Sequence, residues 1–481
     1  MCKINLLVFI LFISTFGNAQ NNSPLIDTVI NSYYKRNTFS GSVLVAQKDK
    51  IILRKSYGKA DREWNIDNTP ETKFRIGSVS KQFTSMLVMQ LYQSKKIDLQ
   101  EKIIAYLPWF DKETGNKITI HHLLSNSSGL PNYTDFPNFL KETAIQQFNP
   151  LQFAKENFKT TLDFEPGIKY VYSNTNYFLL GLIIESVTNK PFEQVLQENI
   201  LSPLQMTNSG IDYPDKVISK RANGYIYTFD GFINSGYINM ASATFACGAL
   251  YSTVDDLFLW HKGLNSEKLI SNETKKIMFS PNIDNYAYGW IVRNISNFMG
   301  TGKSVTLQVH GGRINGFLAL ICRIPEEDVF ITFLNNTRVA NHADVLDNML
   351  NNVVSALYNQ PVSLAKPSPV YEMKHLIETK TINQAIEYYY QLKQHQKDNF
   401  DFGNIADLTN LAEYLTEKNR INDALEIYKL NADENPSSTI AVQTYVLKVA
   451  KQKSKNEAVK YLERSKLAEN TKQKIQEEFE K

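Results

Sequence analysis

The 481-residue sequence is poor in cysteine, of which it has only three. Cys2 lies in the N-terminal leader described below, which leaves Cys247 and Cys322 for the rest of the chain. Both have apolar neighbours, which favours buried free thiols, although the two could pair in an oxidising compartment. A disulfide-dense scaffold is excluded. No CxxC or HExxH motif occurs and the seven histidines are not spaced as ligands, so we expect no metal and no cofactor.

An excess of either charge is also missing. The 52 basic and 49 acidic side chains give a formal net charge of +3. Nucleic-acid-binding domains are usually strongly basic, so we expect neither a nucleic-acid partner nor a polyanionic substrate. The apolar share of 43%, with 27 phenylalanines and 25 tyrosines, is sufficient for a large core. The length predicts two or three domains.

Long apolar runs are missing after the N-terminus. Residues 1–19 combine the basic Lys3, an apolar run over Ile4–Phe16 and small residues at Gly17–Ala19, which is the pattern of a signal peptide. A membrane anchor is the alternative, but thirteen residues are too few to span a bilayer of about 30 Å. We therefore expect cleavage after Ala19 and a periplasmic or secreted protein with no transmembrane segment.

Runs rich in β-forming residues stand near both ends of the first 360 residues. Phe39–Gly58 predicts a hairpin, and Phe317–Arg323 with Val329–Leu334 predicts a second one. The sequence between them has helical patterns, over Phe83–Gln93, Tyr177–Glu185 and Asp255–Leu264. We therefore expect an α+β domain over residues 20–359, in which the two ends of the segment form one antiparallel sheet beside a helical insertion.

The composition changes after a proline-rich linker at residues 360–370. Residues 371–481 predict polar helices, and the pattern Asn, polar, Ala, aliphatic, charged recurs there at Asn383–Glu387, Asn422–Glu426 and Asn456–Lys460. A period near 34 residues resembles tetratricopeptide repeats, with an unrelated helical bundle as the alternative. Such repeats bind a protein or peptide partner in a groove; packing against the first domain is the other interpretation.

A serine and a lysine stand three residues apart at the start of the first helical pattern. On a helix Ser78 and Lys81 share one face, so the hydroxyl and the amine can meet. Free N–H groups at a helix N-terminus favour an oxyanion, and a buried lysine can accept a proton because burial disfavours its charged form. Ser-x-x-Lys also occurs by chance, so further motifs are needed.

Three further motifs follow in the chain. Tyr172-Ser173-Asn174 stands on a loop before an apolar helix, where the tyrosine could equally have a structural role. His310-Gly311-Gly312 lies at the start of the late strand pair, where glycines allow close approach of a substrate or another backbone. The stretch His121–Pro131 predicts a short helix that ends at Gly129.

In this order the motifs resemble those of the serine β-lactamase and penicillin-binding-protein superfamily, most closely its class C-like branch, which includes esterases and D-amino-acid peptidases. The resemblance covers about residues 25–358 and implies a β-lactamase/transpeptidase-like fold. It implies that Ser78 is the acylated nucleophile and that Lys81 takes its proton. It also implies that Tyr172 relays a proton to the leaving group.

The resemblance further implies how the substrate is held. Asn174 would orient the lysine and bind the substrate amide, and His310 and Gly312 would occupy the Lys-Thr-Gly region. The backbone N–H groups of Ser78 and Arg313 would form the oxyanion hole.

The histidine departs from the lysine that lactam-handling members use for the substrate carboxylate. Because a neutral imidazole supplies little charge, we expect little or no β-lactamase activity and an ester or a D-residue amide as substrate. The expected function is an exported serine hydrolase acting on a small molecule or peptide. The alternatives are a penicillin-sensitive DD-peptidase or β-lactamase, and a catalytically silent binding protein that uses the helical repeats.

Overall fold

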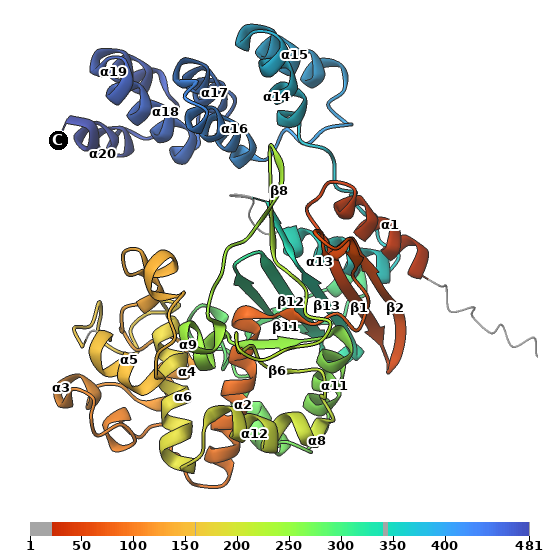
Figure 1. Ribbon diagram of the computed structural model, residues 1–481, viewed down its shortest axis with the longest axis vertical. Coiled ribbons are helices and arrows are strands. Elements are labelled where there is room, and N and C mark those ends of the chain that lie inside the picture. The colour runs from red at the N-terminus through yellow and green to blue at the C-terminus, as the bar shows by residue number, and fades with distance from the viewer. Residues whose placement is uncertain (1–21, 159, 340–344, 481) are drawn as a thin grey trace, which may run out of the picture.

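A computed structural model describes residues 22–158, 160–339 and 345–480. The signal peptide expected at residues 1–19 lies outside the described residues. The chain forms an α+β body, and the C-terminal helices stand together at one end of it (Figure 1). None of the helices in the described ranges combines the length and the apolar composition that crossing a bilayer requires.

The body is built on a six-stranded sheet with the order β10-β11-β12-β13-β1-β2. Its strands are β1 (Gly41–Gln47), β2 (Lys50–Tyr57), β10 (Ile291–Ile295), β11 (Val305–Ile314), β12 (Phe317–Ile324) and β13 (Val329–Asn335). β1 runs antiparallel to β13, with Gly41 opposite Asn335, so the early and late hairpins share one sheet. The predicted α+β fold, with a sheet from both ends of the segment, is confirmed.

Both faces of this sheet are covered by helices. One face carries α1 (Ser23–Tyr34) and α13 (Val345–Leu357), and the other carries α2 (Ser80–Gln93) and α11 (Val254–Asn265). Along β1, Val43 and Val45 pack in the cluster of the first face, and Leu44 and Ala46 in that of the second. Successive strand residues point to opposite faces, so a strand buried on both sides is apolar at successive positions.

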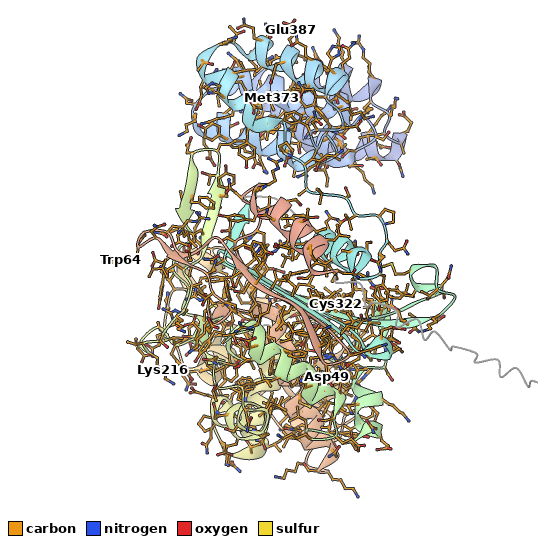
Figure 2. All side chains as sticks on the ribbon, turned by 90° about the vertical axis from the view of Figure 1, so that its right-hand side faces the viewer. Asp49, Trp64, Lys216, Cys322, Met373 and Glu387 are labelled. Atoms are coloured by element: carbon orange, nitrogen blue, oxygen red, sulfur yellow. The ribbon has the colours of Figure 1, made fainter. Side chains whose placement is uncertain are left out.

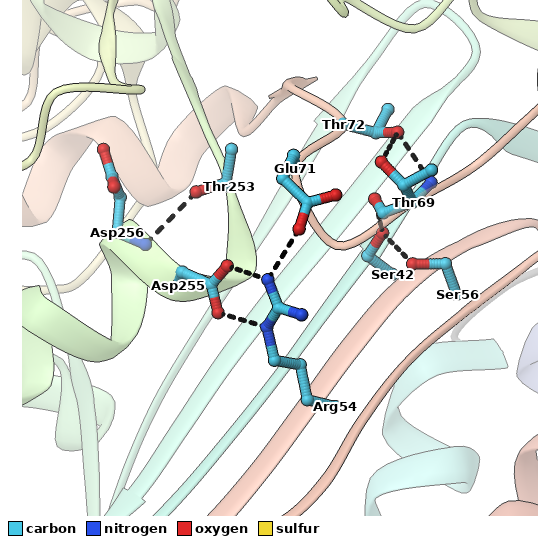
Figure 3. A network of polar contacts seen from close by, with 9 residues as sticks. All are labelled: Ser42, Arg54, Ser56, Thr69, Glu71, Thr72, Thr253, Asp255 and Asp256. Carbon is cyan, nitrogen blue, oxygen red and sulfur yellow. Dashed lines mark hydrogen bonds and ion pairs between the residues drawn. The ribbon is translucent and has the colours of Figure 1, made fainter.

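An arginine on the outer strand β2 connects the sheet to α11. Arg54 donates to both carboxylate oxygens of Asp255, at 2.7 and 2.6 Å, and also to Glu71 at 2.9 Å (Figure 3). The hydrogen bond to Asp255 is the main reason that the pKa of Arg54 is raised. Asp255 lies in the first turn of α11, where Thr253 caps the helix and the dipole favours a carboxylate. The network fixes this end of α11 against the sheet.

The helix predicted to end at Gly129 ends earlier, so that prediction is wrong. α4 spans Ile120–Leu124, because the Ser125 hydroxyl donates to the carbonyl of His121 at 2.7 Å and Asn126 turns the chain with a φ of 54°. Side-chain to backbone hydrogen bonds of this kind compete with helix continuation. The residues that follow form the loop beside the site described below.

The helices after residue 369 have a hydrophobic core of their own. They are α14 (Val370–Thr379), α15 (Ile382–His395), α16 (Ile405–Glu417), α17 (Ile421–Glu434), α18 (Thr439–Gln452), α19 (Lys455–Arg464) and α20 (Glu469–Glu480). Figure 2 shows Met373 inside this group and Glu387 at its outer surface. The alanines of the repeated pattern, Ala385, Ala424 and Ala458, are all buried. The linker at 360–370, the helical domain at 371–481, the tetratricopeptide assignment and a partner for it stay predictions.

A hairpin of the body reaches the C-terminal helices. It consists of β7 (Tyr225–Thr228) and β8 (Gly231–Asn234) and projects toward α14 and α16 (Figure 1). At its tip the Phe229 ring lies 5.2 Å, between centroids, from both Tyr371 and Tyr414. Asp230 accepts a hydrogen bond from the Tyr414 hydroxyl at 2.8 Å and pairs with Lys418 at 2.9 Å. The tip therefore holds the helical group to the body.

We predict that Phe229→Ala loosens this attachment. Each aromatic contact contributes about 0.5–1.5 kcal/mol, so the detached state should become about tenfold more populated. Cleavage by chymotrypsin after Leu364, in the linker, should accelerate accordingly. Trp64→Ala, which removes an exposed ring from another part of the body, serves as the control and should leave the cleavage rate unchanged. Equal rates for Phe229→Ala and wild type would show that the tip does not hold the helices.

Candidate active site

Ser78 lies in a 3₁₀ turn, Gly77–Val79 (η1), directly before α2. Gly77 has a φ of 50°, in the left-handed region, and a Cβ there would lie 3.0 Å from the backbone nitrogen of Arg313. Glycine therefore lets the turn lie against β11. Val79 and the residues of α2 from Ser80 to Met89 are buried, which fixes the serine at the edge of the core.

The amine of Lys81 lies behind the serine and is fully buried. Nζ is 3.2 Å from Ser78 Oγ, 2.7 Å from Asn174 Oδ1 and 2.9 Å from the carbonyl oxygen of Cys247. Burial lowers the pKa of Lys81 to about 8. A neutral amine can donate its two protons to the two carbonyl oxygens and turn its lone pair toward the serine hydroxyl. This geometry fits a proton acceptor.

The phenol of Tyr172 completes the constellation from a third part of the chain. Its hydroxyl donates to Ser78 Oγ at 2.7 Å, and Lys81 Nζ lies 4.8 Å from its ring centroid. Burial raises the pKa of Tyr172 well above the usual range, so the phenol carries its proton at neutral pH. Ser78 Oγ can therefore accept from the phenol while its own proton faces the amine. The structure brings together all three residues that the motifs single out.

Asn174 begins α6 (Asn174–Thr188), immediately after the tyrosine loop. Its Nδ2 donates to Thr134 Oγ1 at 3.1 Å, and its backbone N–H donates to Asn132 Oδ1 at 2.9 Å. The amide oxygen is thereby turned toward Lys81, as a residue that orients the amine requires. The sequence does not single out Asn132 and Thr134, which lie in the loop after α4; the only signal is their position next to the Leu-Pro motif at 130–131.

His310 and Gly312 were predicted at the start of the late strand pair. They lie instead on β11, a separate strand that precedes this pair and pairs with its first strand, β12. A Cβ on Gly312 would lie 1.9 Å from the carbonyl oxygen of Ile76, so only glycine fits there. The His310 imidazole contacts the Gly311 carbonyl at 2.7 Å through Nδ1 and the Tyr286 hydroxyl at 3.2 Å through Nε2. Burial lowers the pKa of His310 to about 4, so the imidazole is neutral at pH 7.

The turn η1 packs closely against β11 at the backbone nitrogens of Ser78 and Arg313. The Cβ position of Gly312 is 3.1 Å from the nitrogen of Ser78, and that of Gly77 is 3.0 Å from the nitrogen of Arg313. Ser78 and Arg313 also line the same two cavities, of about 240 and 590 Å³. That these two N–H groups form the oxyanion hole stays a prediction from the resemblance. Among the described residues, no three His, Cys, Asp or Glu side chains gather where they could hold a metal ion.

Known proteins resemble this chain in its first three quarters. A family model described as Beta-lactamase matches residues 26–356. The teichoic acid D-alanine hydrolase of Staphylococcus aureus (strain MRSA252) is 30% identical over 290 residues, which cover 57% of this chain and 67% of that protein. A putative penicillin-binding protein, PbpX, of Bacillus subtilis (strain 168) is 28% identical over 264 residues, with 55% of this chain and 64% of that protein covered.

The coverage of these relatives is incomplete, since the chain spans 62% of the Protein flp of S. aureus (strain MW2) and 64% of PbpX. Among solved structures, a penicillin binding protein from Bacillus halodurans has a TM-score of 0.57 at 25% identity, covering 65% of this chain and 94% of the other. The D-amino acid amidase from Ochrobactrum anthropi SV3 has a TM-score of 0.61 at 21% identity, with 71% of this chain and 100% of the other covered. At this identity the likeness is evidence for a shared fold only. Since the family match covers more than half of its length, the chain belongs to the beta-lactamase family of serine hydrolases.

Proposed function

We propose that this protein is an exported serine hydrolase that cleaves an ester, or an amide of a D-residue, through an acyl-enzyme on Ser78. The observation that carries the proposal is the pair of contacts at one oxygen, with the Tyr172 hydroxyl 2.7 Å and Lys81 Nζ 3.2 Å from Ser78 Oγ. The similarity to a protein named teichoic acid D-alanine hydrolase supports a D-residue in the substrate.

The chemistry follows from the placement of the groups. Lys81 takes the proton as Ser78 Oγ attacks the substrate carbonyl, and the N–H groups of Ser78 and Arg313 stabilise the oxyanion. Tyr172 gives its proton to the leaving group as the bond to the carbonyl carbon breaks. A water molecule then attacks the carbonyl carbon of the ester on Ser78 and gives a proton to the Tyr172 phenolate. Lys81 returns its proton to Ser78 Oγ as the acyl bond breaks, and the acid product leaves.

The neutral His310 argues against lactams. A substrate carboxylate meets a neutral imidazole at this position instead of a lysine, so cephalosporin hydrolysis should be slow or undetectable beside ester hydrolysis. A penicillin-sensitive peptidase would instead form a long-lived adduct with labelled penicillin, and a silent binding protein would turn over neither class. Rapid cephalosporin hydrolysis would refute the substrate assignment.

The substrate proposal is tested with mirror-image pairs. We expect the purified protein to hydrolyse D-alanyl esters faster than the L-alanyl esters of the same alcohol, while Ser78→Ala hydrolyses neither above the spontaneous rate. Equal rates of hydrolysis for the D-alanyl and L-alanyl esters would contradict the preference for a D-residue. A wild-type protein that hydrolyses no ester or amide of a broad panel would overturn the proposed function itself.

The lowered pKa of the buried Lys81 predicts how the rate of ester hydrolysis depends on pH. Because only the neutral amine can take the serine proton, kcat/KM for an uncharged ester should fall about tenfold per pH unit below about 8, the lowered pKa of Lys81, and level off above it. The measurement is a pH profile from 5.5 to 9.5 with an ester whose leaving group does not titrate in that range. A profile that stays flat between pH 6 and 9 would contradict a lysine base.

A further inference from the structure

Two cavities meet at Ser78, and the proposed chemistry assigns one part of the substrate to each. The larger cavity is lined by Tyr172, the proposed proton donor to the leaving group. The smaller cavity is lined by Asn174 and Thr134, and Ser78 lines both cavities. Because the leaving group must lie beside its proton donor, the smaller cavity receives the acyl group, the part of the substrate that stays on the enzyme.

The hydroxyl of Thr134 accepts two hydrogen bonds from amide side chains. Thr134 is half-buried in the turn η3 (Tyr133–Asp135), in the wall of the smaller cavity. Asn132 Nδ2 donates to Thr134 Oγ1 at 2.7 Å, and Asn174 Nδ2 donates to the same atom at 3.1 Å. A threonine oxygen has two lone pairs and one proton, so these bonds occupy both of its acceptor positions. The hydroxyl can form a further hydrogen bond only as a donor.

The orientation of both amides is fixed by their other partners. Asn132 Oδ1 accepts from the backbone N–H of Asn174 at 2.9 Å, and Asn132 Nδ2 also donates to the carboxylate of Asp135 at 2.9 Å. Asn174 Oδ1 accepts from Lys81 Nζ at 2.7 Å. Exchanging the nitrogen and oxygen of either amide would set donor against donor or acceptor against acceptor. Neither amide can therefore accept the proton of Thr134.

The proton of the Thr134 hydroxyl is left for the cavity. Among the residues that the structure describes, none accepts a hydrogen bond from this hydroxyl. A substrate that covers the hydroxyl without an acceptor leaves a polar group unpaired, which is unfavourable, whereas a substrate with an acceptor completes its hydrogen bonding. The amide of Asn174 connects Thr134 to Lys81, so the donor has a fixed place relative to the proposed base.

We propose that Thr134 donates this hydrogen bond to an acceptor atom in the acyl group of the substrate. The inference rests on the proposed acyl-enzyme on Ser78 and adds a requirement to it. A D-residue whose nitrogen carries an acyl group meets the requirement, because its amide oxygen is the next acceptor along the chain after the scissile carbonyl. Thr134 is then a specificity residue, since it touches the substrate away from the reacting atoms.

The test compares two 4-nitrophenyl esters of equal size, after subtraction of the rate with Ser78→Ala. One is the ester of N-acetyl-D-alanine. The other is the ester of (S)-2-methylpentanoic acid, in which methylene groups replace the amide and the arrangement about the chiral carbon is the same. Thr134→Val and Thr134→Ala should each lower kcat/KM about 3- to 10-fold more for the acetylated ester, the range of one neutral hydrogen bond. Thr134→Ser should keep the wild-type ratio, and hydrolysis of the methylpentanoate shows that a variant is folded.

Thr175→Val is the matched control, because Thr175 holds the same loop from outside the cavity and its proton is already used. Its hydroxyl donates to the carbonyl of Pro131 at 2.6 Å and accepts from the backbone N–H of Tyr133 at 3.0 Å. Its loss affects both esters alike, so the ratio of their kcat/KM values should stay at the wild-type value. An equal fall for both esters in Thr134→Val would mean that Thr134 acts only by positioning Asn174, and would overturn the inference.

A binding measurement separates the inference from the proposed function. Adding Thr134→Val to the Ser78→Ala protein should weaken binding of N-acetyl-D-alanine methyl ester about 3- to 10-fold more than binding of methyl (S)-2-methylpentanoate. An unchanged ratio would contradict the donor role of Thr134. If wild type hydrolyses neither ester and yet the binding ratio changes as expected, the subsite stands and the hydrolase proposal fails. If wild type hydrolyses both esters in a ratio that Thr134→Val leaves unchanged, the hydrolase stands and the inference fails.

Discussion

Replacing Ser78 by alanine is expected to reduce ester hydrolysis on the order of 10⁴-fold or more. Both the phenol of Tyr172 and the amine of Lys81 contact the oxygen that this change removes. Without Oγ no acyl bond can form, and the remaining groups can only polarise a bound substrate. The assay is steady-state hydrolysis of a chromogenic ester by the full-length protein, with folding checked by circular dichroism.

Ser80→Ala is the matched control. Ser80 lies two residues further along the chain, is buried, and accepts a hydrogen bond from the backbone N–H of Leu250 at 3.2 Å. Its loss should cost about 1 kcal/mol of stability and change the rate by no more than a few-fold. If Ser78→Ala kept a tenth of the wild-type activity, or if Ser80→Ala lost as much, the nucleophile assignment would be wrong.

Lys81→Met is the second change with a large expected effect. Methionine has a similar length and is apolar, so it can fill the buried space without the lone pair that takes the serine proton. General base catalysis contributes about 10²- to 10⁴-fold, so we expect acylation to slow by about 10³-fold while Ser78 remains present. The rate of covalent labelling by a fluorophosphonate measures acylation directly, and it should fall in parallel with hydrolysis.

Lys73→Met is the matched control for Lys81→Met. Lys73 is half-buried, with Nζ 5.8 Å from the ring centroid of Tyr251, and lies outside the constellation. Its replacement should leave labelling and hydrolysis within a few-fold of wild type. If Lys81→Met were labelled within tenfold of the wild-type rate, the serine would have to lose its proton to another group.

The sequence predicts those parts of the site that depend on local spacing. The contact between Ser78 and Lys81 follows from helix geometry, because residues three apart share a face. Tyr172 and His310 could be placed only through the resemblance, since nothing in their local sequence says that α6 and β11 border the same serine. The loop residues Asn132 and Thr134 were missed, because their role depends on a tertiary contact with Asn174.

For the fold, too, the sequence predicts local elements, whereas features that depend on tertiary contacts are not predicted. Runs rich in β-forming residues predicted the two hairpins, and their pairing in one sheet followed from the fold class. The helix end at Leu124 was misplaced because local hydrogen bonds of Ser125 decide it. The docking of Phe229 on the C-terminal helices depends on how β7 leaves the body, and no periodicity in the sequence predicts that.

The most direct test of the central claim is covalent labelling followed by peptide mass spectrometry. The intact protein is treated with a fluorophosphonate at pH 8.5, where the Lys81 amine is mostly neutral, and digested. We predict a single adduct on Ser78, formed much more slowly at pH 6 and not formed in Ser78→Ala. Absence of an adduct from the wild-type protein, or an adduct on another residue that persists in Ser78→Ala, would contradict a nucleophilic serine at this position.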